Sequence, residues 1–160
     1  MRRLGNASIT AIYIDVSQIM EKQLELLAKS REIEAKQAMI LAVDDNEDNL
    51  LLLGEVLNVF NCSLITATEG QVALLLAQAY NPDLILLDVM LPDLNGVEVV
   101  RHLKENSITK HIPVIAVTAL ARQEDRDRLL SAGCSEYITK PYMLEDLEAI
   151  VRNYLALQRC

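Results

Sequence analysis

From residue 39 onward, short runs that favour strands alternate with longer segments whose apolar residues recur at helical spacing. The strand-like runs are residues 39–43, 63–68, 84–88, 113–119 and 136–141. The helical patterns are residues 49–60, 71–80, 97–106, 122–133 and 144–158. Unalternated apolar runs are typical of strands that helices cover on both faces, and regular alternation of strand and helix predicts parallel strands. We therefore expect an α/β fold with a doubly wound, five-stranded parallel sheet.

Residues 1–38 follow a different pattern. Apolar residues recur there every seven positions, at Ile12, Ile19, Leu26 and Ile33. They predict one apolar stripe on a helix of roughly 27 residues. The positions that would complete a regular coiled-coil seam are charged: Asp15, Lys22, Lys29 and Lys36.

We therefore expect an N-terminal helical extension, residues 1–38, before a main domain of residues 39–160. The extension is compatible with packing on the main domain, with pairing of two chains, or with an origin in a larger signalling architecture. It is equally compatible with an over-extended start, because Met39 opens the main domain itself, or with a frayed helix.

Charge and hydropathy exclude several classes of partner. The chain has 23 acidic and 15 basic residues and a net charge of −8, which repels a phosphate backbone, so we expect no nucleic-acid binding. No apolar run reaches the roughly 20 residues that cross a bilayer, and no signal peptide is recognisable. The three cysteines form no C-x-x-C pair. We expect a cytoplasmic protein that binds no membrane.

The polar residues with chemical potential follow four of the predicted strands. Asp44 and Asp45 follow the first strand, and Asp88 ends the third. Thr118 ends the fourth strand and Lys140 the fifth. In open parallel sheets, ligands bind beyond the carboxyl ends of the strands, so these side chains are expected at one edge.

Three carboxylates at one edge call for a cation. Each pair at 4 Å repels by roughly 4 kcal/mol at an effective dielectric of 20. Oxygen ligands of this kind favour Mg²⁺, which shares itself with phosphate groups. Lys140 adds a fixed positive charge and Thr118 a hydroxyl donor. Together they indicate a pocket for a carboxylate nucleophile, a metal ion and a phosphoryl group.

Each of these residues alone has an ordinary explanation. Asp45 or Asn46 would serve as a helix cap, Thr118 as a turn residue, and Lys140 as a solvated surface cation. The arrangement at four separate strand ends favours the functional interpretation over these.

With these motifs, the chain resembles the receiver domains of two-component response regulators over about residues 39–158. The matching segments are AVDDN around Asp44–Asp45, LILLDVMLPDLNG around Asp88, AVTAL around Thr118 and YITKP around Lys140. The resemblance implies a flavodoxin-like sheet with strand order 2-1-3-4-5 and a cis Lys140–Pro141 bond. It also implies that Asp88 accepts a phosphoryl group from the phosphohistidine of a histidine kinase.

The resemblance further assigns roles around Asp88. Asp45 and Asp88 would bind Mg²⁺ directly, together with the backbone carbonyl of Met90, and Asp44 would help through water or by its charge. Lys140 would pair with Asp88 and then with the phosphoryl oxygens.

The same resemblance implies a switch. Thr118 would move to hydrogen-bond the phosphoryl group, and Tyr137 would rotate inward behind it. A half-buried strand aromatic is the alternative interpretation of Tyr137. The switch would act on the face formed by the domain's fourth helix, fifth strand and fifth helix, residues 122–133, 136–141 and 144–158.

The implied function is a single-domain response regulator that controls, or relays to, a protein partner. Its partners would be a histidine kinase or phosphotransfer protein and an output protein. A homodimer through the N-terminal helix or through the helix 4–strand 5–helix 5 face is compatible with the sequence. The chain would be a phosphoacceptor that promotes its own phosphorylation and dephosphorylation, rather than an enzyme.

Two alternatives remain open. One is a scaffold that binds partners without phosphorylation, which the complete set of acidic residues, Thr118 and Lys140 disfavours. The other is a phosphohydrolase working through an aspartyl-phosphate. Such enzymes usually carry a D-x-D motif at the first strand, where this chain has adjacent Asp44 and Asp45.

Overall fold

The computed structural model describes residues 16–35, 37–119 and 122–158. The chain divides between residues 36 and 37 into two units. In the first, helix α1 (Val16–Ala35) carries exposed apolar side chains that include Ile19 and Leu26. Ile12 of the predicted stripe lies outside the described residues, as do Asp15 and Lys36 of the charged positions. No helix in the described ranges is long and apolar enough to cross a membrane.

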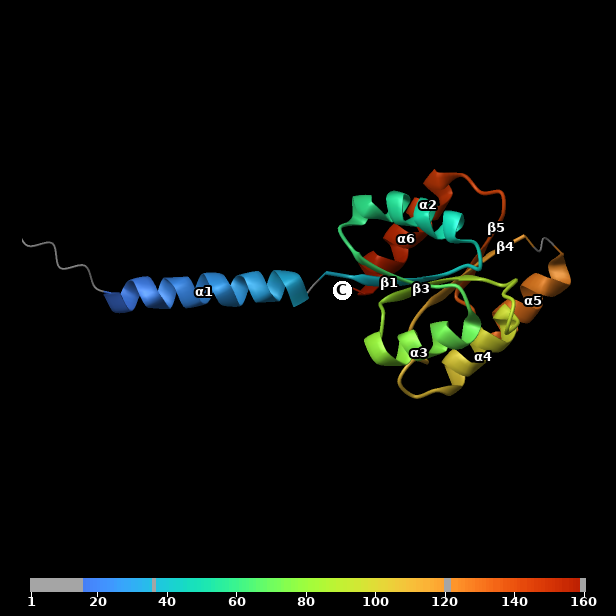
Figure 1. The fold of residues 1–160 in the computed structure, drawn as a ribbon, viewed down its shortest axis with the longest axis horizontal. Coiled ribbons are helices and arrows are strands. Elements are labelled where there is room, and N and C mark those ends of the chain that lie inside the picture. The colour runs from blue at the N-terminus through green and yellow to red at the C-terminus, as the bar shows by residue number, and fades with distance from the viewer. Residues whose placement is uncertain (1–15, 36, 120–121, 159–160) are drawn as a thin grey trace, which may run out of the picture. The chain divides into compact units, whose positions relative to one another are not determined.

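The second unit is built on a five-stranded parallel sheet with the order β2-β1-β3-β4-β5 (Figure 1). This order and the parallel pairing confirm the predicted doubly wound fold. The strands are β1 (Met39–Val43), β2 (Ser63–Ala67), β3 (Leu84–Asp88), β4 (Val114–Thr118) and β5 (Glu136–Thr139).

Helices cover both faces of the sheet (Figure 1). On one face lie α2 (Glu47–Leu57) and α6 (Leu144–Gln158), and on the other lie α3 (Gly70–Tyr80), α4 (Gly96–Glu105) and α5 (Gln123–Ala132). Successive strand residues point to opposite faces. In β3, therefore, Leu84 and Leu86 pack in the core beneath α2 and α6, whereas Ile85 and Leu87 pack in the other core. Because helices cover both faces of the sheet, residues pointing to either face are apolar, and the strands appear in the sequence as unalternated apolar runs.

Capping explains where α2 departs from the sequence pattern, which predicts a helix over residues 49–60. The helix begins two residues earlier because the Asn46 side chain accepts a hydrogen bond from the backbone N–H of Asp48. It ends at Leu57 and continues as the 3₁₀ turn η1 (Asn58–Phe60). Asn61 then adopts a left-handed conformation with φ 49°, which stops the helical path.

The loop after β3 turns back on itself at Gly96. The Gly96 N–H donates to the carbonyl of Val89 at 2.9 Å, and the Asn95 side chain accepts from the N–H of Val97 to cap α4. A Cβ atom at Gly96 would lie 2.5 Å from the Cα of Val89, closer than side chains tolerate. Glycine is therefore required for this close approach of two backbone segments.

We predict that Gly96→Ala lowers the free energy of unfolding by roughly 1–3 kcal/mol, because the backbone of Val89 must shift to admit the methyl group. Urea unfolding followed by circular dichroism measures the change. Gly54→Ala is the matched control, since its added Cβ meets only the Leu64 side chain, at 3.5 Å within a helix. The control should be neutral or stabilising by about 0.5–1 kcal/mol. Equal destabilisation by both changes would contradict the argument.

Candidate functional site

The carboxyl ends of four strands bring the candidate residues to one corner of the sheet. Asp44 and Asp45 directly follow β1, and Asp88 is the last residue of β3. Thr118 is the last residue of β4, and Lys140 directly follows β5. The residues come from separate crossover units, and the parallel topology alone sets them side by side.

Three carboxylates gather at this corner. One carboxylate oxygen from each of Asp44, Asp45 and Asp88 lies within 4.8 Å of the others. Asp44 is 3% exposed and Asp88 7% exposed, whereas Asp45 reaches solvent. Burial weakens the screening of negative charge by water, so the corner has a strong attraction for cations.

Lys140 supplies one of the compensating charges. Its Nζ donates to Asp44 Oδ2 and to Asp88 Oδ2, both at 2.9 Å. Burial by itself would lower the pKa of this amine, but the hydrogen bonds to Asp44 and then Asp88 outweigh it, and the pKa of Lys140 is raised. The lysine is therefore held in its charged form, bridging the first and third strands.

The two buried carboxylates also accept hydrogen bonds from nearby N–H groups, which fix their orientation. Asp44 Oδ1 accepts from the backbone N–H of Asn46 at 2.9 Å, and both Asp44 oxygens accept from Asn49 Nδ2. Asp88 Oδ1 accepts from the backbone N–H of Met90 at 2.9 Å. Asp88 thus presents one oxygen to Lys140 and the other to its own loop.

Thr118 is fully buried at the end of β4. Its carbonyl accepts a hydrogen bond from the backbone N–H of Lys140 at 2.8 Å, so the fourth and fifth strand ends are joined at the site. The Lys140–Pro141 peptide bond is cis, as the resemblance implied. Tyr137 lies half-buried on β5 and packs against the core on the α3–α5 side of the sheet.

Asp93 contributes to the corner in a way that the sequence did not reveal. Its side chain, in the loop after Asp88, accepts from the backbone N–H groups of Gly70 and Gln71 at 2.7 and 2.8 Å. The bonds from Gln71 and then Gly70 lower the pKa of Asp93. The residue at the N-cap of α3, Glu69, makes no side-chain cap bond. Asp93 therefore caps α3 from a remote loop and fixes that loop beside the site.

Asn49 was also missed. It looks like an ordinary polar residue in the first turn of a helix, and only the fold shows that its amide points to Asp44. An asparagine one helical turn after the Asp-Asp-Asn sequence was the available signal. The bond from Asp93 to α3 had no local signal, because it joins segments more than twenty residues apart.

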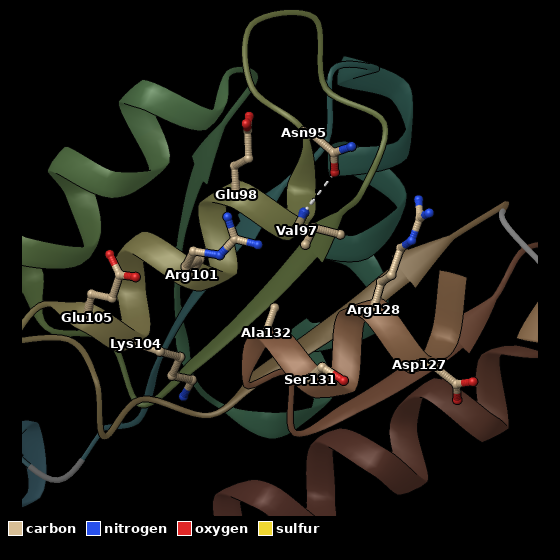
Figure 2. A pocket seen from close by; sticks show the side chains of 10 residues that line it. All are labelled: Asn95, Val97, Glu98, Arg101, Lys104, Glu105, Asp127, Arg128, Ser131 and Ala132. Carbon is tan, nitrogen blue, oxygen red and sulfur yellow. Dashed lines mark hydrogen bonds between the residues drawn. The ribbon is translucent and has the colours of Figure 1, made fainter. Parts of the chain in front are cut away.

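A large groove in the described part of the chain lies elsewhere. It has a volume of about 800 Å³ and runs between α4 and α5, with Arg101 and Arg128 among the side chains that line it (Figure 2). None of the five candidate residues lines this groove. The candidate site is at the strand ends, where the carboxylates of Asp44, Asp45 and Asp88 gather.

The donor set of the corner fits a hard divalent cation. Carboxylate oxygens within 4.8 Å of one another are the ligands that Mg²⁺ prefers, and one exposed member leaves room for water molecules in its shell. Lys140 forms its ion pairs with Asp44 and Asp88, and the exposed carboxylate of Asp45 lies outside these pairs, where a metal ion can reach it.

One known protein family matches most of the chain. The model of the response regulator receiver domain matches residues 40–152. This chain belongs to the response regulator receiver domain family.

Curated relatives and solved structures agree with this assignment. The polar-differentiation response regulator DivK of Brucella ovis is 39% identical over 116 residues, which are 72% of this chain and 94% of that protein. The chemotaxis protein CheY4 of Vibrio cholerae has a TM-score of 0.69 at 27% identity, covering 74% of this chain and 98% of that one.

A third relative carries a metal ion. The receiver domain of a sensor histidine kinase from Pseudomonas aeruginosa has a TM-score of 0.69 at 30% identity, covering 75% of this chain and 98% of that domain. Its structure holds a magnesium ion coordinated in the active site cleft.

We predict that Lys140→Gln destabilises the fold at neutral pH by roughly 1–3 kcal/mol, because two buried carboxylates lose their cation. The pKa of Lys140 is raised above its ordinary 10.5 in the folded chain. Its contribution is therefore complete below pH 10.5 and is lost as the pH rises through the folded value.

Urea unfolding of both proteins from neutral to alkaline pH measures this difference. The gap between wild type and Lys140→Gln should stay constant up to about pH 10 and narrow as the pH rises above 10.5. Lys110→Gln, which removes an exposed lysine from the loop after α4, is the control and should show no such gap. A gap that widened with rising pH would contradict the ion-pair argument.

Proposed function

We propose that this chain is a phosphorylation-dependent response regulator in which Asp88 accepts a phosphoryl group from a histidine kinase or phosphotransfer protein. Receiver domains of this family generally act as phosphoacceptors rather than as enzymes of the ordinary kind. The observation that carries the proposal for Asp88 is its position. It is a buried carboxylate at a strand end, 2.9 Å from Lys140 and within 4.8 Å of two further carboxylates.

The proposed reaction is a transfer between two nucleophiles. A carboxylate oxygen of Asp88 forms a bond to phosphorus while the bond from phosphorus to the donor's histidine nitrogen breaks, and that nitrogen keeps the electron pair. Lys140, already held against Asp88, would follow the negative charge onto the phosphoryl oxygens. Asp93 and the Met90 N–H hold the loop that carries Asp88, so the nucleophile is positioned before the donor arrives.

Mg²⁺ would be held by Asp45, Asp88 and the backbone carbonyl of Met90, with Asp44 contributing its charge. When bound, it would neutralise the carboxylates and the phosphoryl oxygens together. Asp45 is the exposed member of the acidic cluster, so it is the carboxylate most free to turn toward the ion.

Phosphorylation would change the charge on Asp88 from one negative charge to nearly two and add three acceptor oxygens. The Thr118 hydroxyl would be drawn toward these oxygens, and Tyr137 would turn inward behind it. Because the Thr118 carbonyl accepts from the Lys140 N–H, a shift at either strand end acts on the other. The output would be a bias of about 1–3 kcal/mol on the face formed by α5, β5 and α6.

The proposed function also includes a domain organisation and a mode of pairing. Residues 39–160 would form the receiver domain and residues 1–38 a helical extension, acting in the cytoplasm on a protein partner. A homodimer would use either α1, whose apolar side chains are exposed, or the face formed by α5, β5 and α6.

We predict that the wild-type protein gains the mass of one phosphoryl group when incubated with phosphoramidate or acetyl phosphate and Mg²⁺. Intact-mass spectrometry measures the gain, which Asp88→Asn should abolish because the amide is not a nucleophile. Asp127→Asn, an exposed position on α5, is the control and should be labelled like wild type. Labelling of Asp88→Asn would place the acceptor elsewhere. No labelling of folded wild type by either donor would favour a phosphorylation-independent scaffold.

We also predict that Mg²⁺ raises the thermal unfolding temperature of the wild type. At a concentration tenfold above the dissociation constant, binding to the native state adds about 1.4 kcal/mol. Asp45→Asn should be more stable than wild type without Mg²⁺, because one carboxylate of the repelling group is neutral, and should gain less from the ion.

Differential scanning calorimetry with MgCl₂, and with NaCl at matched ionic strength, separates binding from screening. Glu55→Gln, an exposed change on α2, is the control and should gain as much as wild type. Equal gains for Asp45→Asn and the control would contradict the role of Asp45.

A further inference from the structure

Arg126 of α5 lies against the aromatic ring of Tyr137 on β5. The guanidinium carbon is 4.7 Å from the ring centroid, within the range of a cation–π contact. Both residues are half-buried. The contact joins a helix to the strand beside it, and its two members are eleven positions apart in the sequence.

The ring is the partner that the described structure offers this cation. The Nε atom of Arg126 is buried and, among the described residues, has no hydrogen-bond partner. Burying this nitrogen without a hydrogen bond is costly, and removal of water around it strengthens the attraction of the cation to an aromatic face. The position of Arg126 is therefore governed by the ring, and the ring in turn is covered by the guanidinium.

Few other side-chain contacts hold helix α5 in place. Of its ten residues only Leu129 is buried, and the residue at its N-cap, Arg122, makes no side-chain cap bond. Helix α4, by comparison, buries four residues and is capped by Asn95. One contact therefore counts for more in holding α5 against the sheet than it would in α4.

The contact also lies close in sequence to two of the strand ends of the site. Tyr137 pairs in register with Ala116, two residues before Thr118, and it precedes Lys140 by three residues. Helix α5 begins five residues after Thr118. A movement of Thr118 or of the strand leading to Lys140 therefore acts on both members of the pair.

We propose that Arg126 is a positioning residue that holds the Tyr137 ring in its resting place and so opposes activation. The proposal rests on the proposed function, in which Tyr137 turns inward after phosphorylation of Asp88. An inward turn takes the ring away from the guanidinium, so the cation–π contact must be given up. Its removal would shift the equilibrium toward the activated ring position by about threefold to tenfold.

The test compares Arg126→Gln with Arg128→Gln in the full chain. Arg128 is an exposed arginine two residues further along α5, and its side chain lies at the groove with α4 (Figure 2). Fluorotyrosine is incorporated at the five tyrosines, and Tyr137→Phe identifies the signal of Tyr137. Fluorine NMR spectra are recorded without and with beryllofluoride and Mg²⁺, which stand in for the phosphoryl group.

In the absence of beryllofluoride, the Tyr137 signal of Arg126→Gln should move toward its position in activated wild type. The ratio of ring states should change about threefold to tenfold, while Arg128→Gln stays at the wild-type ratio. Arg126→Lys should fall between them, because an ammonium stacks less well on a ring than a guanidinium. Arg126→Gln spectra that match those of Arg128→Gln would overturn the role of Arg126 and leave the proposed function standing.

Two further outcomes distinguish a failure of the Tyr137 switch from a failure of the proposed function. If wild-type Tyr137 does not respond to beryllofluoride while Asp88 is phosphorylated, the Tyr137 switch fails, and this inference fails with it. If Asp88 accepts no phosphoryl group, the proposed function fails, whatever the ring does.

A double-mutant cycle of Arg126→Lys and Tyr137→Leu in urea unfolding tests the cation–π contact without any phosphoryl donor. It replaces the fluorine NMR comparison if Arg126→Gln does not fold. Coupling of the two changes by more than twofold in the unfolding equilibrium constant is expected. Smaller coupling would overturn the contact.

Discussion

The attraction between one ammonium group and two buried carboxylates holds the site together. Lys140 bonds to Asp44 and Asp88 at 2.9 Å each, and these are the ion pairs within 4 Å in the described part of the chain. Without a cation, strand ends carrying buried carboxylates would repel one another, and this edge of the sheet would be destabilised. The buried carboxylates therefore require a positive charge at the residue that follows β5, and they make the corner attractive to cations.

The positions of the site residues follow from periodicity and topology, which the sequence carries in full. Apolar runs are local signals, and once strands are known to be parallel, Asp44, Asp88 and Lys140 must end at the same edge. Their distances could not be predicted, because they depend on register between strands and on side-chain rotamers. The motif around each residue narrowed the interpretation to one family, and the comparisons support that family independently.

The contacts that sequence reasoning missed share a physical property. Asp93 caps a helix that begins more than twenty residues before it, and Arg126 covers a ring on the next strand. Neither side chain differs in type from an ordinary surface residue, so composition and spacing say nothing about its partner. Asn49 lies close in sequence to Asp44, yet its role depends on the first turn of α2 starting where Asn46 caps it. Contacts of this kind become visible only when the backbone is placed.

The bond between Lys140 and Asp44 spans 96 positions of the chain, which is most of the length of the domain. During synthesis, the acidic residues leave the ribosome long before the lysine that compensates them. A nascent chain with the first four strands would hold its carboxylates without their partner, and the edge that becomes the site would stay open until β5 docks. Lys140 can compensate the buried carboxylates only after β5 has docked, so the charge balance of the corner depends on completion of the fold.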